Sequence, residues 1–234
     1  MRLADVQRNY DRLARRYDFL NRVVFDRLLG LESWRARTVE QLRLSEGQSV
    51  LDIACGTGLN LPLLRAAVGA EGRVVGLDYS DGMLAEARRR VHEHGWENVE
   101  LVQGDAALLE GVGGPFDAVI STWALGIVDA LPAALHRAVE ELSPQGRLAI
   151  LDFHSTRPTS RVARALNPIA HWFLLRSGVD TAEDLADGRL RERWSAGKAQ
   201  LREALDEVVE VEYFHATGFL LSGTRRGIGT ERAE

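Results

Sequence analysis

A run of small residues stands where a predicted strand gives way to a predicted helix. The strand at 49–54 leads into the loop 55–58 (CGTG), and apolar residues at helical spacing follow at 59–68. Small residues in such a turn let backbone N–H groups approach a ligand closely, and the N-terminus of the next helix favours negative charge. The segment predicts a nucleotide or cofactor loop, although glycines in a tight turn can also serve the geometry of the turn alone.

Acidic side chains stand at the ends of the first three predicted strands. Asp52 lies in the first, Asp78 closes the strand at 73–78, and Asp105 follows the strand at 99–103. A carboxylate at the end of the second strand can accept hydrogen bonds from both hydroxyls of a ribose. Asp78 or Asp105 alone could instead cap a helix or a turn. Because parallel strands place their carboxyl ends at one edge of an open sheet, the three together favour a ligand crevice there.

Short β-branched runs alternate with helical stretches, which is typical of a parallel sheet built from βαβ units. Strands are expected at 49–54, 73–78, 99–103, 116–122 and 147–153, with helical segments near 59–68, 81–94, 106–110 and 130–142. Two further strands, 208–214 and 217–224, stand close enough to form an antiparallel hairpin. We therefore expect a Rossmann-like, doubly wound α/β fold with a mostly parallel sheet of seven strands.

A chain of 234 residues suits one α/β domain better than two. Within this domain, 1–234, we expect N-terminal helices at 1–45, a cofactor-binding core at 46–154, a helical insertion at 155–206 and a hairpin at 207–226. An insertion of that length is typical of a cover over a substrate site. We interpret the N-terminal helices as a lid over the cofactor, although their arginines and aromatic residues also suit peripheral contact with an anionic membrane surface.

The composition excludes several classes of protein. The net charge of -5 disfavours binding to nucleic acid, which normally needs a basic surface. The single cysteine, Cys55, rules out an internal disulfide and a cysteine-rich zinc site, and no basic neighbour in the sequence would activate it as a nucleophile. No apolar run approaches the roughly 20 residues that span a bilayer, and no secretory signal is recognisable. We expect a cytoplasmic protein without a metal site.

The identity of the cofactor depends on the residues around the loop. Nicotinamide enzymes usually carry Gly-x-Gly-x-x-Gly, whereas Leu61 stands at the third position here. Four segments instead resemble the successive motifs of class I methyltransferases: 51–58 (LDIACGTG), 76–84 (GLDYSDGML), 103–106 (QGDA) and 142–148 (LSPQGRL).

This resemblance implies that the cofactor is S-adenosylmethionine. It assigns the methionine end to Asp52 and the loop backbone, the ribose to Asp78, and the amine of the adenine to Asp105. The cofactor contacts that it implies are Asp52, Ala54, Gly56, Thr57, Gly58, Asp78, Tyr79, Met83, Asp105, Ala106, Thr122 and Trp123. Of these, Tyr79 and Met83 would flank the adenine, and Thr122 and Trp123 would border the methyl group.

Within this superfamily, the chain resembles the branch that contains the ubiquinone and menaquinone C-methyltransferases and the bacterial phospholipid N-methyltransferases. Residues 17–21 (YDFLN) are similar to an element that precedes the fold in that branch, and Ala54 suits the quinone group. The segment 143–146 (SPQG) differs from the Lys-Pro-Gly-Gly usual in the quinone enzymes. The acceptor stays open between a quinone-like phenol, another small or lipophilic molecule, and the amine of a phospholipid.

A general base is needed only for a carbon or oxygen acceptor, because a neutral amine can attack the methyl group directly. His154, just past the fifth strand at the ligand edge, is the candidate base, although it can equally stabilise a turn. Tyr17 is expected near the sulfonium, where an aromatic ring favours a cation. Two other functions stay open: a nicotinamide oxidoreductase, which Leu61 disfavours, and a binding module that has kept the cofactor fold without catalysis.

Overall fold

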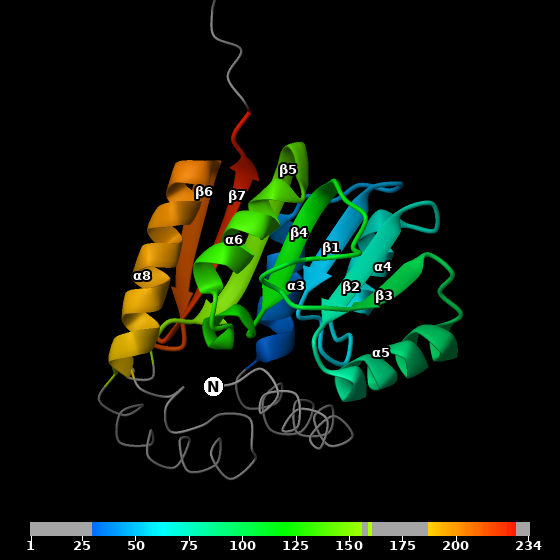
Figure 1. Ribbon diagram of the computed structural model, residues 1–234, viewed down its shortest axis with the longest axis horizontal. Coiled ribbons are helices and arrows are strands. Elements are labelled where there is room, and N and C mark those ends of the chain that lie inside the picture. Colours follow the sequence, from blue (N-terminus) through cyan, green and yellow to red (C-terminus); the bar gives the residue numbers. More distant parts are fainter. Residues whose placement is uncertain (1–29, 156–158, 161–186, 228–234) are drawn as a thin grey trace, which may run out of the picture.

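The computed structural model describes residues 30–155, 159–160 and 187–227, which form one sheet with helices on both faces (Figure 1). The strands are β1 (Ser49–Ile53), β2 (Arg73–Asp78), β3 (Val99–Gln103), β4 (Phe116–Thr122), β5 (Leu142–Phe153), β6 (Leu205–Tyr213) and β7 (Gly218–Arg225). The helices are α3 (Leu31–Gln41), α4 (Leu61–Val68), α5 (Asp81–His94), α6 (Leu131–Glu140) and α8 (Asp187–Ala204), with a 3-10 turn η2 (Leu125–Ile127).

The order of the strands is β3-β2-β1-β4-β5-β7-β6. Strands β1 to β5 run parallel to one another, and β7 pairs antiparallel with both β5 and β6. The sheet therefore has the seven strands, the parallel core and the C-terminal hairpin that we predicted. The chain reverses its direction of travel across the sheet between β1 and β4, and open α/β sheets bind ligands at the carboxyl ends of the strands at such a point.

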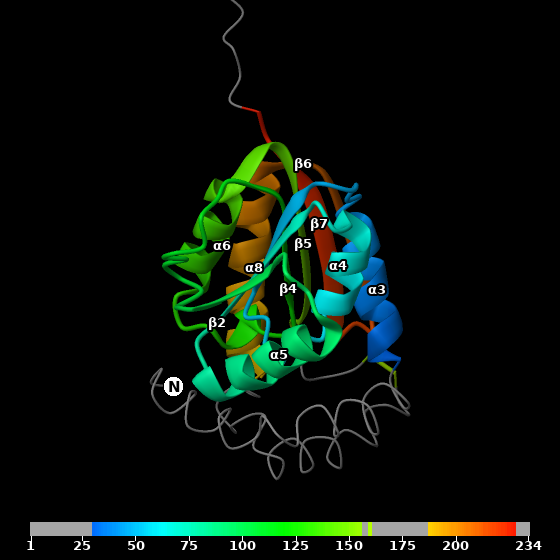
Figure 2. The same ribbon diagram turned by 90° about the vertical axis from the view of Figure 1, so that its right-hand side faces the viewer.

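Alternate residues of the central strands point to opposite faces of the sheet. Val50 and Val74 pack with residues of α3, α4 and α5, whereas Leu51 and Val75 pack with residues of α6 and α8. Figure 2 shows α6 and α8 on one side of the sheet and α3 and α4 on the other. Because both faces are covered, the parallel strands are apolar along most of their length, which explains why they were recognisable in the sequence.

The boundaries of β2, β3 and β4 coincide with those we predicted, and α5 spans the predicted residues 81–94. β5 begins earlier than predicted, at Leu142: Phe116 pairs with Leu142 and Ala118 with Arg147, so the residues between them bulge out of the pairing. The bulge places Gln145 at a φ of 67°.

The segment near 106–110, predicted to be helical, is a turn instead. Asp105 accepts a hydrogen bond from the backbone N–H of Ala107 at 2.8 Å through its side chain, which satisfies a donor at the start of the turn. Leu109 then adopts a φ of 51°, which ends any helical path. The side chain of Asp105 thereby shapes the chain that follows β3.

The insertion at 155–206 ends in α8, which belongs to the same layer as α6. Its Trp194 is fully buried, and the ring centroid lies 4.7 Å from that of Phe219 on β7. Residues 1–29 and most of 156–186 lie outside the described part of the chain, so the predicted lid and the predicted substrate cover stay predictions. None of the helices in the described residues is long and apolar enough to cross a membrane.

Replacing Trp194 with alanine is expected to lower the free energy of unfolding by about 3 to 5 kcal/mol, because the change leaves a cavity between α8 and the sheet. Trp194→Phe should cost clearly less, since the buried indole N–H has no hydrogen-bond partner among the described residues and its loss breaks no bond there. Urea unfolding measures both variants. An alanine variant within about 1 kcal/mol of the parent would contradict this packing.

Candidate active site

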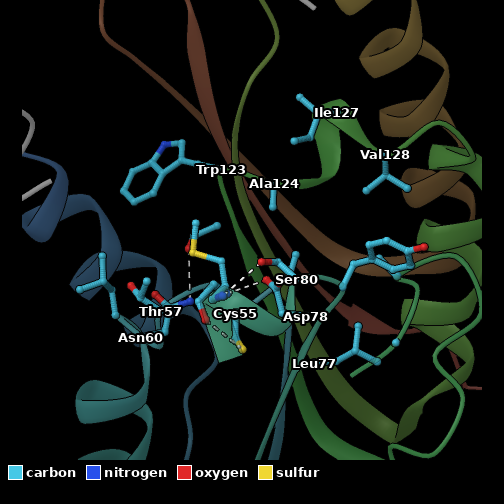
Figure 3. Close-up of a pocket in the computed structure, with 18 of the residues that line it drawn as sticks. Cys55, Thr57, Asn60, Leu77, Asp78, Ser80, Trp123, Ala124, Ile127 and Val128 are labelled. Atoms are coloured by element: carbon cyan, nitrogen blue, oxygen red, sulfur yellow. Dashed lines mark hydrogen bonds between the residues drawn. The ribbon is translucent and has the colours of Figure 1, made fainter. Parts of the chain in front are cut away.

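A pocket lies at the carboxyl ends of β1 to β4, at the point where the strand order reverses (Figure 3). It encloses about 1080 Å³, counting the part that is open to solvent, which is room for a cofactor of nucleoside size. Figure 3 shows Trp123, Ile127 and Val128 on one side of the pocket and Cys55 and Asp78 on the other. The pocket is therefore bounded by the loops after β1 and β2 and by the chain that follows β4.

All but two of the residues predicted to contact the cofactor line this pocket; the exceptions are Asp52 and Gly58. Cys55, whose backbone we expected to contact the cofactor as part of the loop, also lines the pocket. The lining residues that we did not predict as contacts are Arg35, Leu59, Asn60, Leu77, Ser80, Gly104, Ala124, Ile127, Val128 and Asp129.

The loop after β1 turns by means of residues with positive φ. Ala54, Gly56 and Gly58 have φ angles of 55°, 56° and 78°. A Cβ on Gly56 would have no atom within 4 Å, so this position faces open space. A Cβ on Gly58 would lie 2.6 Å from Cδ1 of Leu61, so this glycine lets the loop pack against α4. Gly56 therefore faces the pocket, whereas Gly58 faces α4 and does not line the pocket.

The carboxylate of Asp78 is fixed by two backbone donors. The N–H of Gly56 donates to Oδ2 at 2.8 Å, and the N–H of Ser80 donates to Oδ1 at 2.9 Å. A carboxylate has about four acceptor positions, so an oriented one suits the recognition of a vicinal diol. Ser80 also caps α5 by accepting a hydrogen bond from the N–H of Met83 at 3.1 Å, which sets Met83 in the pocket wall.

Asp52 is fully buried behind Asn60 rather than exposed to the pocket. The amide Nδ2 of Asn60 donates to both carboxylate oxygens of Asp52, at 3.0 and 3.1 Å, and lies 3.2 Å from Oγ1 of Thr122. Burial raises the pKa of Asp52 to about 7, although the hydrogen bond from Asn60 and the charge of Arg35 act in the opposite direction. Asp52 therefore does not line the pocket but orients the side chain of Asn60, which does.

The indole of Trp123 is held at its edge by a short relay. Its Nε1–H donates to the hydroxyl of Tyr213 at 2.7 Å, and that hydroxyl donates to the backbone oxygen of Asp152 at 3.2 Å. Burial raises the pKa of Tyr213, so the phenol keeps the proton that this relay needs. The carboxylate of Asp152 also accepts a hydrogen bond from the N–H of Gly126 at 2.9 Å, which fixes η2 and thereby Ile127. One residue thus supports two parts of the wall.

His154 does not line the pocket. Its Nε2 lies 3.1 Å from the carbonyl oxygen of Ala216, and Nζ of Lys198 lies 2.7 Å from its Nδ1. Burial and the charge of Lys198 lower the pKa of His154, which keeps the imidazole neutral and engaged at both nitrogens. This geometry does not support the role of general base, which stays a prediction, and Tyr17 lies outside the described residues.

The thiol of Cys55 lines the pocket but is poorly suited to nucleophilic chemistry. Burial raises its pKa well above the ordinary value, and the negative charges of Asp78 and Asp52 add to this effect. A Cβ on Gly76 would lie 2.9 Å from Sγ, so the thiol packs closely over β2. This agrees with the expectation that Cys55 is not activated as a nucleophile.

Arg35 and Asn60 are polar side chains of the pocket wall that the sequence analysis did not predict. Asn60 stood in the sequence as the one polar residue in an apolar run, 59–64 (LNLPLL), and this contrast was the available signal. Arg35 lies on α3, outside every motif, and reaches the pocket only because α3 packs across the sheet beside α4.

The raised pKa of Asp52 implies that the free energy of unfolding depends on pH. The folded protein holds this proton with a pKa of about 7 against an ordinary value of 3.8, so the contribution of Asp52 is fully present at low pH and is lost as the pH rises toward 7. Relative to Asp52→Asn, the parent should lose about 4 kcal/mol of unfolding free energy between about pH 4 and pH 8. Urea unfolding of both proteins without cofactor measures this difference. A difference independent of pH would contradict the assignment.

Residues 1–189 match the model of the ubiE/COQ5 methyltransferase family. The chain is 36% identical over 182 residues to a 2-phytyl-1,4-naphtoquinone methyltransferase of Thermosynechococcus vestitus, covering 77% of this chain and 76% of that protein. It is 34% identical over 183 residues to a demethylmenaquinone methyltransferase of Symbiobacterium thermophilum, covering 74% and 71%.

Solved structures share the fold. A SAM dependent methyltransferase from Aquifex aeolicus matches with a TM-score of 0.60 and 19% identity, over 82% of this chain and 89% of that one. A putative S-adenosyl-L-methionine-dependent methyltransferase from Methanococcus maripaludis matches with a TM-score of 0.65 and 14% identity, over 93% and 94%. Since the family model spans most of the sequence, the chain belongs to the ubiE/COQ5 methyltransferase family and is an enzyme that uses S-adenosylmethionine.

Proposed function

We propose that this enzyme methylates a quinone-like aromatic acceptor. The observation that carries the proposal is the pocket at the carboxyl ends of β1 to β4, which combines polar residues suited to the cofactor with an apolar group formed by Trp123, Ala124, Ile127 and Val128. The acceptor class comes from the relatives, whose names specify 2-phytyl-1,4-naphtoquinone and demethylmenaquinone. These names favour a quinone-like acceptor over the amine of a phospholipid.

The polar half of the pocket fits S-adenosylmethionine. Asp78 is oriented for the two ribose hydroxyls, and Asp105, after β3, can accept a hydrogen bond from the amine of adenine. Tyr79 and Met83 provide apolar surface for the adenine ring, and the open space at Gly56 lets the ligand approach the backbone. The bound cofactor supplies an activated methyl group, and these residues fix where that group stands.

The other half of the pocket suits a planar, weakly polar acceptor. Trp123, Ala124, Ile127 and Val128 give it an apolar wall. Trp123 is a non-glycine residue with a φ of 53°, and the relay through Tyr213 holds it in that conformation. Fixing the acceptor against such a wall brings the reacting atoms together and excludes water, and holding two reactants in line supplies much of the rate of a displacement reaction.

Some parts of the proposal concern residues outside the described ranges. The N-terminal helices would close over the cofactor, with Tyr17 near the sulfonium, and their basic residues would bring the enzyme to the membrane that contains lipophilic quinones. The insertion before α8 would cover the acceptor. The family match begins at residue 1, which supports a role of the N-terminal segment in the same enzyme.

Asp78→Ala is expected to weaken the binding of S-adenosylmethionine and S-adenosylhomocysteine about tenfold or more, because hydrogen bonds to a charged group contribute roughly 1.5 to 3 kcal/mol each. Calorimetric titration measures both affinities. The matched control is Asp81→Ala, which removes an exposed carboxylate of α5 that pairs with Arg88 outside the pocket. Unchanged affinity in Asp78→Ala, or equal losses in the two variants, would remove Asp78 from the cofactor site.

The acceptor is tested with the parent enzyme and isotopically labelled S-adenosylmethionine. A short-chain prenyl-naphthoquinol that lacks the ring methyl group should gain one label on a ring carbon, located by fragmentation in a mass spectrometer. Vesicles that contain phosphatidylethanolamine, offered under the same conditions, should gain no label above background. Transfer to the lipid amine with none to the naphthoquinol would overturn the proposed acceptor class while leaving the cofactor assignment in place.

A further inference from the structure

Arg35 is a buried cation in the wall of the cofactor pocket. It lies on α3, outside every motif quoted above, and only 6% of its surface is exposed. Its guanidinium lies 4.8 Å from the centroid of the Trp123 ring, and Nη1 lies 3.3 Å from Oδ1 of Asn60 and 3.4 Å from Oγ1 of Thr122. These contacts hold the guanidinium at the end of the pocket where α3, α4 and β4 meet.

Charge is distributed unevenly along the pocket. Among its lining residues in the described ranges, Arg35 is the only arginine or lysine, whereas the carboxylates are those of Asp78 at the end of β2, Asp105 after β3 and Asp129 after η2. The strand order β3-β2-β1-β4 places Asp78 and Asp105 on one side of the loop after β1 and Arg35, beside Thr122 of β4, on the other. A complementary ligand has hydroxyl and amine donors at one end and an anionic group at the other.

The side chain of Asn60 fixes this polarity. Its Oδ1 accepts from Arg35, so its Nδ2 must face Asp52, to which it donates. The amide therefore separates the buried carboxylate from the guanidinium and presents its acceptor side to the cation. Because the pKa of Asp52 is raised to about 7, near neutral pH this carboxyl carries only part of a negative charge.

S-Adenosylmethionine has hydroxyl and amine donors on its adenosine and, at its amino acid end, a carboxylate next to an ammonium group. With its adenine at Asp105 and its ribose at Asp78, the cofactor would extend past the loop after β1, and its amino acid end would lie near Asn60. We infer that Arg35 binds the α-carboxylate of S-adenosylmethionine and thereby selects cofactors that carry it. This inference rests on the proposed placement of the cofactor in the pocket. An arginine suits the task, because its planar guanidinium can bind a carboxylate through two parallel hydrogen bonds.

The test compares two ligands that differ only in this group: S-adenosylmethionine and its decarboxylated form, which keeps the adenosine, the sulfonium and the amine. Calorimetric titration of the parent should show about 10-fold to 100-fold tighter binding of the intact cofactor. In Arg35→Gln this preference should fall toward unity, because affinity for the intact cofactor drops while affinity for the decarboxylated form changes less than about threefold. This comparison of affinities does not depend on enzymatic activity.

Two further variants isolate the role of the guanidinium. Arg37→Gln removes the same charge from an exposed position on the same helix, where the side chain lies over Trp34, and it should keep the preference of the parent. Arg35→Lys keeps the charge without the planar fork and should retain part of the preference. Thermal melting without ligand reports whether each variant is folded. If Arg35→Gln does not fold, the ligand preference of Arg35→Lys tests the inference.

Three other outcomes distinguish a failure of the Arg35 assignment from a failure of the cofactor site. Equal losses for both ligands in Arg35→Gln would overturn the inference, since the residue would then only shape the pocket. Unchanged affinities with a raised KM for the naphthoquinol would also overturn it, by assigning the guanidinium to an oxyanion of the acceptor instead. A parent enzyme that binds neither ligand would contradict the cofactor site itself.

Discussion

The pocket depends on one buried hydrogen-bonded group, the amide of Asn60. This side chain joins Asp52 of β1, Thr122 of β4 and Arg35 of α3 at the point where the strand order reverses. A buried carboxylate is costly without donors, and both oxygens of Asp52 receive the same NH₂ group. Because Asp52 accepts from Nδ2 of Asn60, the Oδ1 atom of the same amide faces Arg35 and accepts a hydrogen bond from it. The hydrogen bonding of a buried carboxylate in β1 thus determines which atom of Asn60 faces Arg35 in the pocket.

The apolar wall of the site, at Trp123 and Ile127, is held in place by residues of β5 and β6. Asp152, at the end of β5, fixes η2 through its carboxylate and receives the hydroxyl of Tyr213 on its backbone oxygen. Tyr213 lies on β6 and holds Trp123. The antiparallel hairpin therefore extends the sheet and also positions an aromatic side chain on the wall of the pocket.

Periodicity and motifs predicted what depends on local sequence, and tertiary contacts decided the rest. The parallel strands and the residues at their ends, such as Asp78, followed from apolar runs that both faces of the sheet bury. Arg35 could not be predicted, since only the packing of α3 brings it to Asn60, far along the chain. His154 was correctly placed past β5, but Lys198 of α8 engages its ring, and no pattern in the sequence announces that pairing.

The central claim is that the charge distribution of this pocket fixes the direction in which S-adenosylmethionine lies. A crystal structure of the complex with S-adenosylhomocysteine tests it most directly, because that ligand keeps both the ribose and the α-carboxylate. The account predicts the ribose hydroxyls on the carboxylate of Asp78 and the α-carboxylate within hydrogen-bond distance of Arg35, with the Asn60 amide oriented as it is here. A ligand that lies in the reverse direction, or whose carboxylate points away from Arg35 into solvent, would contradict it.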